Sequence, residues 1–463
     1  QGNINTAGFV GTTADIANGD FLSQTKLNFA TAGNLNGSIV NEGQISVADE
    51  GLVALVAPNV RNDGVIVGKL AKVALGAGDT FAVDLYGDGL LSLGLKDDAS
   101  KRLVKAENAG TIKADGGNVA LRAADASSMV SGVVNNSGVI EAHGFQKRNG
   151  EIILTAGGGS VNVSGKLDVS GANGGGNVRI GGDAAGKGTL AKAKDVTITK
   201  DAIINADADS QGDGGHVVLW SEDLTRFEGQ INARGGLLGG NGGFIETSSK
   251  YVLSVEEGLV NALAPHGLAG TWLLDPTTAN IVSGSPAGSA NYSAGSHSTP
   301  GGSTANIRVS SINSASANVV IGASRDININ TDIAMTRSGV GLTLNAGDNI
   351  NATNRSISTQ NGAVTMNAGK DYSGDQRDTD TLNLSGTTIN TRGGAVDLNS
   401  NTSSGDKITL TNTAINTGGG SLSVDASAAV SITDSAGNPS TIQTGGGEAS
   451  ITSQQGSISV DNM

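Results

Sequence analysis

Cysteine is absent from this sequence of 463 residues, which excludes a disulfide framework and any metal site built from thiolates. Aromatic residues make up only 3% of the chain, so we expect no thick core filled by aromatic rings. No apolar run reaches about 18 residues, so no helix is predicted to span a membrane. The formal charge of -14 argues against a broad surface for nucleic acid or anionic lipid, because binding phosphate groups requires clustered lysine and arginine.

Patterns that would indicate metal or cofactor chemistry are also missing. The four histidines, His143, His216, His266 and His297, show no ligand spacing such as His-x3-His. The glycine-rich runs lack the Gly-Lys-Ser/Thr ending of a phosphate-binding loop. They also lack the nonapeptide repeat of calcium-binding β-rolls. We therefore predict no metal site and no cofactor.

Acidic and basic residues do occur together on the expected outer faces, where they are candidates for catalysis. The groups are Asp168 with Arg179, Asp183 with Lys187, Asp213 with His216, and Glu222 with Asp223 and Arg226. Glycoside hydrolysis needs two carboxyl groups held across a sugar, and spacing along the sequence does not establish that geometry. We interpret these groups as solvated faces and predict no catalytic residues, with a polysaccharide-degrading enzyme as an open alternative.

Glycine, by contrast, is abundant: 71 residues, about twice the usual share of roughly 7%. Some of it belongs to a first signature, Asn-x-Gly-x-Ile, found at Asn41 to Ile45, Asn62 to Ile66, Asn108 to Ile112 and Asn136 to Ile140. Because asparagine and glycine tolerate positive φ, the signature predicts a tight corner followed by a strand. Asparagines at one corner of successive coils are expected to stack as a hydrogen-bonded ladder.

A second signature, Gly-x-Φ-x-Φ with Φ apolar, runs through the whole sequence. It starts at Gly51, Gly117, Gly150, Gly159, Gly176, Gly215, Gly243, Gly362, Gly394, Gly420 and Gly447. The Φ residues are expected to be buried and the residues between them solvated, so that Ile152 faces inward and Ile153 outward. Among the Φ positions only Thr247 is polar.

The spacing of these copies decides between repeat architectures. The last four starts lie 32, 26 and 27 residues apart, with short alternating strands and no helical pattern between them. Such a period matches one coil of a parallel β-helix, whereas a β-propeller blade needs about 40 to 45 residues. The predicted fold class is all-β, a right-handed parallel β-helix (β-solenoid) with small hairpin and loop extrusions. Its hand follows from the general rule for parallel crossovers.

Two segments interrupt the repeats and suggest how the chain is divided. Phe81 to Leu95 alternates around Gly87-Asp88-Gly89, which predicts a β-hairpin that projects from the stack or covers it. Pro276 to Ala305 is rich in serine, glycine and proline. The predicted parts are residues 1–145 and 146–276 in one stack, a loop or linker at 277–306, and Asn/Ser/Thr-rich β-helix repeats at 307–463 that continue beyond this chain.

A few aromatic residues suggest ligand contact. Trp220 falls on the outward phase of its strand, and Phe227, Phe244 and Tyr251 are expected near it if adjacent coils align. An exposed strip of these rings could stack on sugars or on a partner protein. In the alternative, a loop or the serine-rich segment covers Trp220. Trp272 is expected to plug the stack, with Pro276 ending its strand.

Several stretches resemble the filamentous-haemagglutinin-like exoproteins of two-partner secretion, large β-helical proteins that Gram-negative bacteria export across the outer membrane. The similar stretches are Ala7 to Leu22, Val40 to Gly68, Val73 to Asp79, Asp84 to Ser92, Val133 to Ala142, Gly242 to Ser249 and Gly270 to Ile281. An Asn-Pro-Asn turn that the family carries upstream of the first stretch is absent. Residues 1–145 are therefore expected to be the C-terminal part of a secretion domain, and both ends of the chain to be internal to a longer protein.

The resemblance implies export through a dedicated outer-membrane transporter, folding outside the cell, and adhesion. We predict a non-enzymatic, secreted repeat protein of the bacterial cell surface or biofilm matrix. As a rigid rod it would attach multivalently to glycans, host cells or other copies of itself, without binding nucleic acid. The stalk of a contact-dependent inhibition toxin and a haem-carrier-binding exoprotein are the alternatives within the same family.

Overall fold

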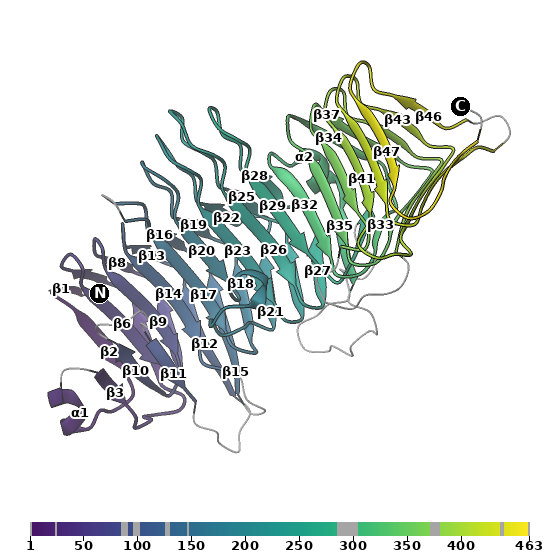
Figure 1. Ribbon diagram of the computed structural model, residues 1–463. Coiled ribbons are helices and arrows are strands. Elements are labelled where there is room, and N and C mark those ends of the chain that lie inside the picture. The colour runs from purple at the N-terminus through teal and green to yellow at the C-terminus, as the bar shows by residue number, and fades with distance from the viewer. Residues whose placement is uncertain are drawn as a thin grey trace. The chain divides into compact units, whose positions relative to one another are not determined.

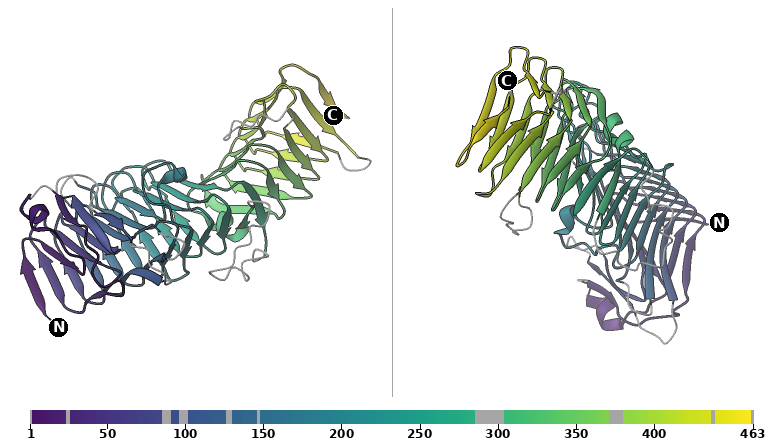
Figure 2. Two further views of the ribbon diagram at one scale, coloured as in Figure 1. Left: turned by 90° about the horizontal axis from the view of Figure 1, so that it is seen from below. Right: turned by 90° about the vertical axis from the view of Figure 1, so that its right-hand side faces the viewer.

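The computed structural model describes residues 2–23, 26–84, 91–95, 102–125, 130–145, 148–284, 304–370, 380–435 and 439–461. The chain divides into two compact units. The first unit contains Gln1–Glu246 and Ala262–Gly270, and the second contains Thr247–Asn261 and Thr271–Met463. Each unit is described by itself, and Figures 1 and 2 show the first in purple to teal and the second in green to yellow.

In the first unit the chain passes repeatedly through three short strands, and each strand pairs in parallel with its counterpart in the next coil. Sheet 1 contains β1 (Asn3–Thr6), β5 (Gln44–Val47), β8 (Val65–Val67), β13 (Thr111–Lys113), β16 (Val139–Glu141), β19 (Lys166–Asp168), β22 (Ile203–Asn205) and β25 (Gln230–Asn232). Sheet 2 contains β2 (Phe9–Thr12), β6 (Leu52–Ala57), β9 (Lys72–Ala77), β14 (Asn118–Ala123), β17 (Glu151–Ala156), β20 (Asn177–Ile180) and β23 (His216–Ser221). Sheet 3 contains β4 (Ser38–Asn41), β7 (Asn59–Asn62), β12 (Arg102–Asn108), β15 (Val130–Asn136), β18 (Ser160–Val163), β21 (Asp195–Ile198) and β24 (Leu224–Phe227). The predicted parallel β-helix is confirmed.

The interior of this stack is a set of aliphatic columns. Ile45, Ile66, Ile112 and Ile140, which end the four copies of the first signature, face one another in register and are buried. Alternation places every second residue of a strand in this column and sends the others outward. The low aromatic content follows, because a narrow interior between three sheets is filled by Ile, Val, Leu and Ala.

The asparagines of the first signature form the predicted ladder. Asn41 donates to Asn62, Asn62 to Asn108, and Asn108 to Asn136, each from Nδ2 to Oδ1 at 2.8 Å. The sequence suggested that glycine occurs at this corner because the backbone needs positive φ there. That explanation is wrong, because neither these glycines nor the asparagines adopt positive φ. A Cβ on Gly64 would instead overlap the carbonyl oxygen of the glycine one coil earlier, and the same holds through the column. These glycines are required by close approach between coils.

A small antiparallel sheet covers part of the outer face of sheet 2. It contains β3 (Lys26–Phe29), β10 (Thr80–Asp84) and β11 (Leu91–Gly94), paired in the order β11-β10-β3. The predicted hairpin is therefore present, while its turn at residues 87–89 lies outside the described residues. Phe29 and Phe81 stack with ring centroids 4.3 Å apart over Ala74, Ala120 and Ile153. Ile153 faces outward as predicted and is nevertheless buried by this cover.

The second unit repeats the same architecture. One sheet contains β29 (Thr271–Asp275), β32 (Asn318–Ala323), β35 (Leu342–Ala346), β38 (Val364–Asn367), β41 (Val396–Ser400), β44 (Leu422–Ala426) and β47 (Ala449–Ser453). Another contains β27 (Val252–Val255), β31 (Thr304–Arg308), β30 (Thr278–Val282), β33 (Ile327–Ile329), β36 (Ile350–Thr353), β39 (Thr381–Ser385), β42 (Lys407–Thr411), β45 (Ala429–Thr433) and β48 (Ile458–Val460). A third contains β34 (Ile333–Ser338), β37 (Ser356–Gln360), β40 (Thr388–Asn390), β43 (Ala414–Asn416) and β46 (Thr441–Gln443).

The repeat intervals of the second unit are real coil lengths. Val364 faces Val396, Val396 faces Leu422, and Leu422 faces Ala449, which reproduces the steps of 32, 26 and 27 residues. Of the segment expected to be a loop or linker at 277–306, the ends form strands β30 and β31, which pair with each other. Residues 285–303 lie outside the described residues.

Trp272 fills the interior of the second unit, as expected for a plug. It is fully buried on β29, and its indole Nε1 donates a 3.0 Å hydrogen bond to Thr247 Oγ1. The strand ends at Asp275, directly before Pro276. Thr247, the polar exception in the second signature, is thus the partner that lets a buried indole satisfy its donor.

The remaining elements are short. Two strands complete the set, β26 (Phe244–Ser249) and β28 (Leu259–Asn261). Two six-residue helices, α1 (Asn18–Ser23) and α2 (Val309–Ser314), and a 3-10 turn η1 (Ala184–Gly186) were not expected from the sequence, since six residues are too few to show a helical period. Among the residues that the structure describes, no helix has the length and apolar character needed to cross a membrane.

Candidate functional site

The aromatic residues predicted to form an exposed strip have different surroundings, and Phe227 is wrongly included because it is fully buried in the interior. Trp220 is only 7% exposed, because residues 181–193 fold over it; a Cβ on Gly186 would overlap its ring, and Lys192 Nζ lies 5.4 Å from its centroid. Phe244 is half-buried, with its ring centroid 6.1 Å from that of His216. Tyr251 belongs to the second unit, is 41% exposed, and has Lys250 Nζ 5.1 Å from its ring. Trp220 therefore points outward under a loop, the alternative that the sequence left open.

The loop that covers Trp220 also forms one wall of a hollow on the outer face of sheet 2. We name this hollow the outer groove. It has two neighbouring parts of about 670 Å³ and 700 Å³, and the linings of both include Glu151, Arg179 and Thr189. Leu93 of the hairpin lines the first part, and His216 lines the second. The groove thus begins beside the small antiparallel sheet and ends at the imidazole that neighbours Phe244.

Strand register decides which side chains line the floor. Outward positions of successive coils fall in rows, and one row is Lys72, Asn118, Glu151, Asn177 and His216. A second row is Ala74, Ala120, Ile153, Arg179 and Val218, which changes from apolar to charged where the hairpin cover ends. The groove lies where that change occurs.

Arg179 joins the floor of the groove to its wall. Its Nη2 lies 2.5 Å from Glu151 Oε1 on the neighbouring strand, and its Nη1 lies 2.6 Å from Asp183 Oδ1 on the loop. The other oxygen of Asp183 accepts a hydrogen bond from Leu190 N at 2.9 Å, which closes the loop on itself. Burial alone would lower the pKa of Arg179, but the hydrogen bond to Asp183 and the charge of Glu151 raise it above its ordinary value.

Arg122 adds a second guanidinium to the groove. It follows Leu121 on β14 and lines the first part of the groove. Burial, and then the like charge of Arg179, lower the pKa of Arg122. Arg122 and Arg179 thus line the same part of the groove, where Arg179 is already bound by Glu151 and Asp183.

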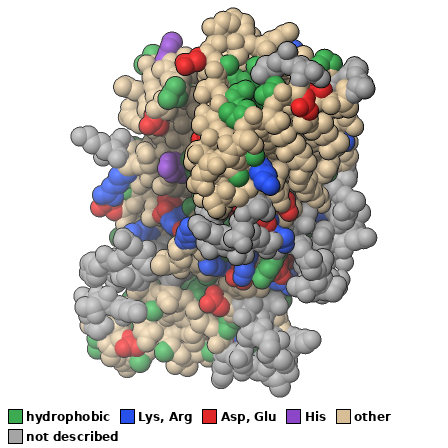
Figure 3. Space-filling view, turned by 45° about the vertical axis from the view of Figure 1, so that its right-hand side comes forward, with side chains coloured by type: hydrophobic (Ala, Val, Ile, Leu, Met, Phe, Trp, Pro, Cys, Tyr) green, Lys and Arg blue, Asp and Glu red, His purple; other side chains and the backbone are tan. Residues whose placement is uncertain are grey.

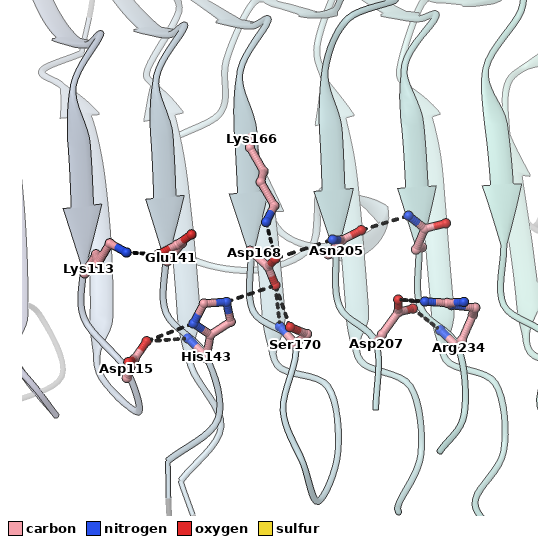
Figure 4. Close-up of polar contacts among 11 residues, drawn as sticks. Lys113, Asp115, Glu141, His143, Lys166, Asp168, Ser170, Asn205, Asp207 and Arg234 are labelled. Atoms are coloured by element: carbon pink, nitrogen blue, oxygen red, sulfur yellow. Dashed lines mark hydrogen bonds and ion pairs between the residues drawn. The ribbon is translucent and has the colours of Figure 1, made fainter. Parts of the chain in front are cut away.

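A second polar cluster runs along the corner where sheet 1 ends, and we name it the corner ladder (Figure 4). It contains two in-register columns, Lys113, Glu141, Asp168, Asn205 and Asn232, and, two residues further in each coil, Asp115, His143, Ser170, Asp207 and Arg234. Neighbouring coils are connected at every step. Examples are Lys113 to Glu141 at 2.9 Å and Arg234 to Asp207 at 2.7 Å.

His143 is the centre of the corner ladder. Its Nδ1 lies 3.0 Å from Asp115 Oδ1 and its Nε2 lies 3.6 Å from Asp168 Oδ1 (Figure 4). The hydrogen bond to Asp168 is the largest of the effects that raise the pKa of His143 to about 9, against the lowering effect of burial. Such an imidazolium stays charged at neutral pH, so it offers neither a general base nor a metal ligand.

Asp168 is held from several sides. Burial would raise its pKa, but His143, Lys166 at 2.8 Å and the Ser170 hydroxyl at 2.7 Å together lower it well below the ordinary value. The suggested pairing of Asp168 with Arg179 is wrong, because Asp168 lies in sheet 1 with the ladder while Arg179 lies in the groove of sheet 2. Within the described residues, no group of three or more His, Cys, Asp or Glu side chains is arranged to hold a metal ion.

Sequence reasoning missed both the groove and the ladder. The ladder did have a signal: each coil carries two polar residues in an i, i+2 pair directly after a buried Ile or Leu, as in Glu141 and His143 after Ile140. Aligning the coils on that buried residue would have grouped the ladder. The groove had no such signal, because its wall at 181–193 breaks the repeat.

Comparison with known proteins identifies the N-terminal part. Residues 1–169 match the family model of the TPS secretion domain, where TPS stands for two-partner secretion. The chain is also similar to the crystal structure of the HMW1 secretion domain from Haemophilus influenzae, at 29% identity over 59% of this chain and 76% of that chain, with a TM-score of 0.44. No curated protein matches the chain. Residues 1–169 are therefore similar to the secretion domain of two-partner secretion exoproteins, and a domain of this kind implies an outer-membrane transporter as the partner in export.

Proposed function

We propose that this exoprotein is an adhesin of the bacterial surface or biofilm matrix. The observation that supports the proposal most directly is the register of the coils. Outward residues recur in straight rows on sheet 2, so the stack offers a surface of closely repeated polar groups. On the face in Figure 3, most of the described surface consists of backbone and of side chains that are neither charged nor hydrophobic.

Repetition favours attachment through many weak contacts. A contact made by one coil holds the neighbouring coils close to the same surface, which raises the effective concentration for further contacts. Glycans, host-cell proteins and other copies of the chain are the ligands that such a surface suits. The exposed ring of Tyr251, and Phe244 at the end of the outer groove, are proposed contacts within it.

Binding is favoured over hydrolysis at the outer groove. Glu151 and Asp183, the carboxylates nearest its centre, are both bound to the guanidinium of Arg179. A glycosidase needs one carboxyl group that is protonated at the working pH and a second that is placed across the sugar. Here both carboxylates are instead engaged by the same cation.

The test compares the binding of the soluble protein with the binding of many copies of it displayed together on a bead. Purified chain would be coupled at high density to fluorescent beads, and attachment to epithelial cells and to biofilm matrix would be measured beside the soluble protein. An adhesin of this kind binds on beads at least tenfold more strongly than in solution. Beads that attach to neither surface, and do not cluster with one another, would overturn the proposal.

A further inference from the structure

We propose that a projecting set of loops inserts its tip into a zwitterionic lipid bilayer through three leucine side chains, Leu237, Leu238 and Leu268. The ligands of the proposed adhesin are glycans, proteins and other copies of the chain, so this inference goes beyond that function and does not depend on it. The loops give the protein a direct contact with the membrane of a target cell.

Three loops in successive coils form the projection, and we name it the glycine fin. They follow β22, β25 and β28 and contain residues 206–215, 233–243 and 262–270 (Figure 1). All three loops belong to the first unit. They pack backbone against backbone, because a Cβ on Gly240 would overlap the carbonyl oxygen of Gly212, and a Cβ on Gly267 would overlap that of Gly240. The fin is therefore a thin, ordered extension of the stack.

The tip of the fin departs from ordinary turn chemistry. Gly236 and Gly239 pair across a tight turn, so Leu237 and Leu238 are its two central residues. Such positions usually carry Gly, Asn, Asp, Pro or Ser. Here the two side chains are 66% and 78% exposed, and Leu268 on the next loop is 76% exposed. The turn does not require leucine and the interior gains nothing from it, so these side chains are suited to contact with another surface.

The backbone of the fin is prepared for an apolar environment. Neighbouring loops are hydrogen-bonded to one another: Leu238 N donates to Ser210 O at 2.8 Å, and Gly242 N donates to Leu268 O at 2.9 Å. Backbone groups without a partner are costly in hydrocarbon, so irregular loops do not normally enter it. Bonds between the loops lower that cost, and glycine adds no polar side chain to the flanks of the fin.

The size of the apolar tip favours lipid over a second copy of the chain. Three leucine side chains expose a few hundred Å² at most, which is the size of an ordinary surface patch. A stable protein interface buries about 800 Å² on each partner. Two fins that met through their tips would fall short of that area. Shallow insertion into a bilayer needs no matching partner surface, and it gains from each apolar side chain.

The charges of the fin select the kind of bilayer. Its acidic residues are Asp207, Asp209 and Asp213, and its one arginine, Arg234, lies 2.7 Å from Asp207. The three loops contain no lysine. Anionic membranes attract clustered lysine and arginine, so they would repel this fin and a chain that carries -14. A zwitterionic bilayer imposes no such repulsion.

The experiment is flotation of the whole chain with phosphatidylcholine vesicles. We expect the protein to float with the vesicles, and the double change Leu237→Ser with Leu238→Ser to reduce the bound fraction at least about fivefold, because it removes most of the apolar tip. The matched control is Leu259→Ser, since Leu259 is 50% exposed but lies on strand β28 outside the fin. Absence of flotation of the unchanged protein, or an equal loss in the control, would overturn the proposal.

A fluorescent reporter gives a second readout of insertion. The two tryptophans of the chain, Trp220 and Trp272, are buried, so Leu238→Trp adds an exposed indole at the tip. Its emission should shift to the blue when vesicles are added, and lipids brominated on their acyl chains should quench it. If the double serine variant loses β-structure by circular dichroism, this reporter decides. An emission that neither shifts nor is quenched contradicts insertion.

Two further outcomes would identify a different occupant and overturn the lipid assignment. The first is stronger flotation with phosphatidylglycerol vesicles than with phosphatidylcholine vesicles, which an acidic fin does not predict. The second is sedimentation that shows a dimer of the unchanged chain but a monomer of the double serine variant, which would make a second copy the occupant. Bead attachment is measured separately, so failure of the adhesin proposal and failure of this one are distinguishable.

Discussion

The two units stack the same kind of coil and both carry asparagine ladders, but the first unit also has the charged corner ladder. In the first unit the corner ladder is charged, with a cation beside each carboxylate, as in His143 between Asp115 and Asp168 (Figure 4). In the second unit neutral groups repeat: Asn367 donates to Asn345 at 2.6 Å, and Asn399 donates to Asn367 at 2.9 Å. Both ladders lie between strands in parallel register.

The two kinds of ladder differ because amide side chains and charged side chains can be stacked in register in different ways. A neutral amide carries a donor and an acceptor, so identical residues can bind one another through any number of coils. Identical charges in register repel, so a charged column must mix signs. The corner ladder of the first unit therefore depends on pH, whereas the asparagine ladder of the second unit should not, since Asn does not titrate.

The largest loss of stability is expected from changes to the buried aliphatic columns, which both units have. Ile140 of the first unit and Ile389 of the second are both fully buried in aliphatic columns. Replacing either by alanine should cost about 2–5 kcal/mol of local stability, because it leaves a cavity between coils. Hydrogen exchange of peptides around each site measures the loss. Loss of protection in only one unit would show that the two interiors are not equivalent.

A smaller effect is expected in the neutral ladder of the first unit. Asn108→Ala leaves the Asn62 donor and the Asn136 acceptor without a partner in a buried site, at a cost of about 2–4 kcal/mol. Asn351→Ala in the second unit is the comparison, since Asn351 is half-buried and water can replace the lost partner. Urea unfolding should rank Asn108→Ala as the more destabilising, and the reverse order would contradict the importance of burial.

The pH dependence distinguishes the units directly. The pKa of His143 is raised to about 9, so its stabilising effect is complete below its unfolded value of about 6.5 and is lost as pH rises through 9. Because its side chain is 36% exposed, solvent screens the contacts and we expect about 1 kcal/mol. Hydrogen exchange, corrected for intrinsic rates, should show residues 139–145 and 148–170 losing protection in this window.

Two controls accompany the pH experiment. His143→Gln should remove the decline, because no group of the ladder then titrates between pH 6.5 and 9 to the same extent. Peptides from residues 380–417 should show no change. A parallel decline in those peptides would mean that the effect is not confined to the charged corner. The pKa of Asp168 is lowered, so its own contribution is present above about pH 4 and is lost on acidification.

The smallest effect is expected for an exposed ion pair of the second unit. Arg308 lies 2.6 Å from Glu257, whose side chain is 73% exposed. Glu257→Gln should change stability by less than about 1 kcal/mol, and added salt should reduce the difference further. A larger loss in thermal melting would show that the second unit also relies on charge.

Much of the fold was predictable because a β-helix repeats. The Asn-x-Gly-x-Ile copies fall in register at Ile66, Ile112 and Ile140, and the intervals of the second signature are coil lengths. The cover on Ile153 was less predictable, since an outward residue is buried there by a hairpin distant in the sequence. The burial of Trp220, which also faces outward, likewise depends on the loop at 181–193.

Reading the sequence alone was enough to establish the coil, its columns, the asparagine ladder and the resemblance to exported exoproteins, because each depends on residues that recur at the period of the chain. Only the tertiary structure could place Arg122 beside Arg179 and a groove on the outer face of sheet 2. These arrangements depend on which outward positions become neighbours in register and on where irregular segments fold back. No local pattern encodes that, because outward residues are not constrained by the packing of the interior.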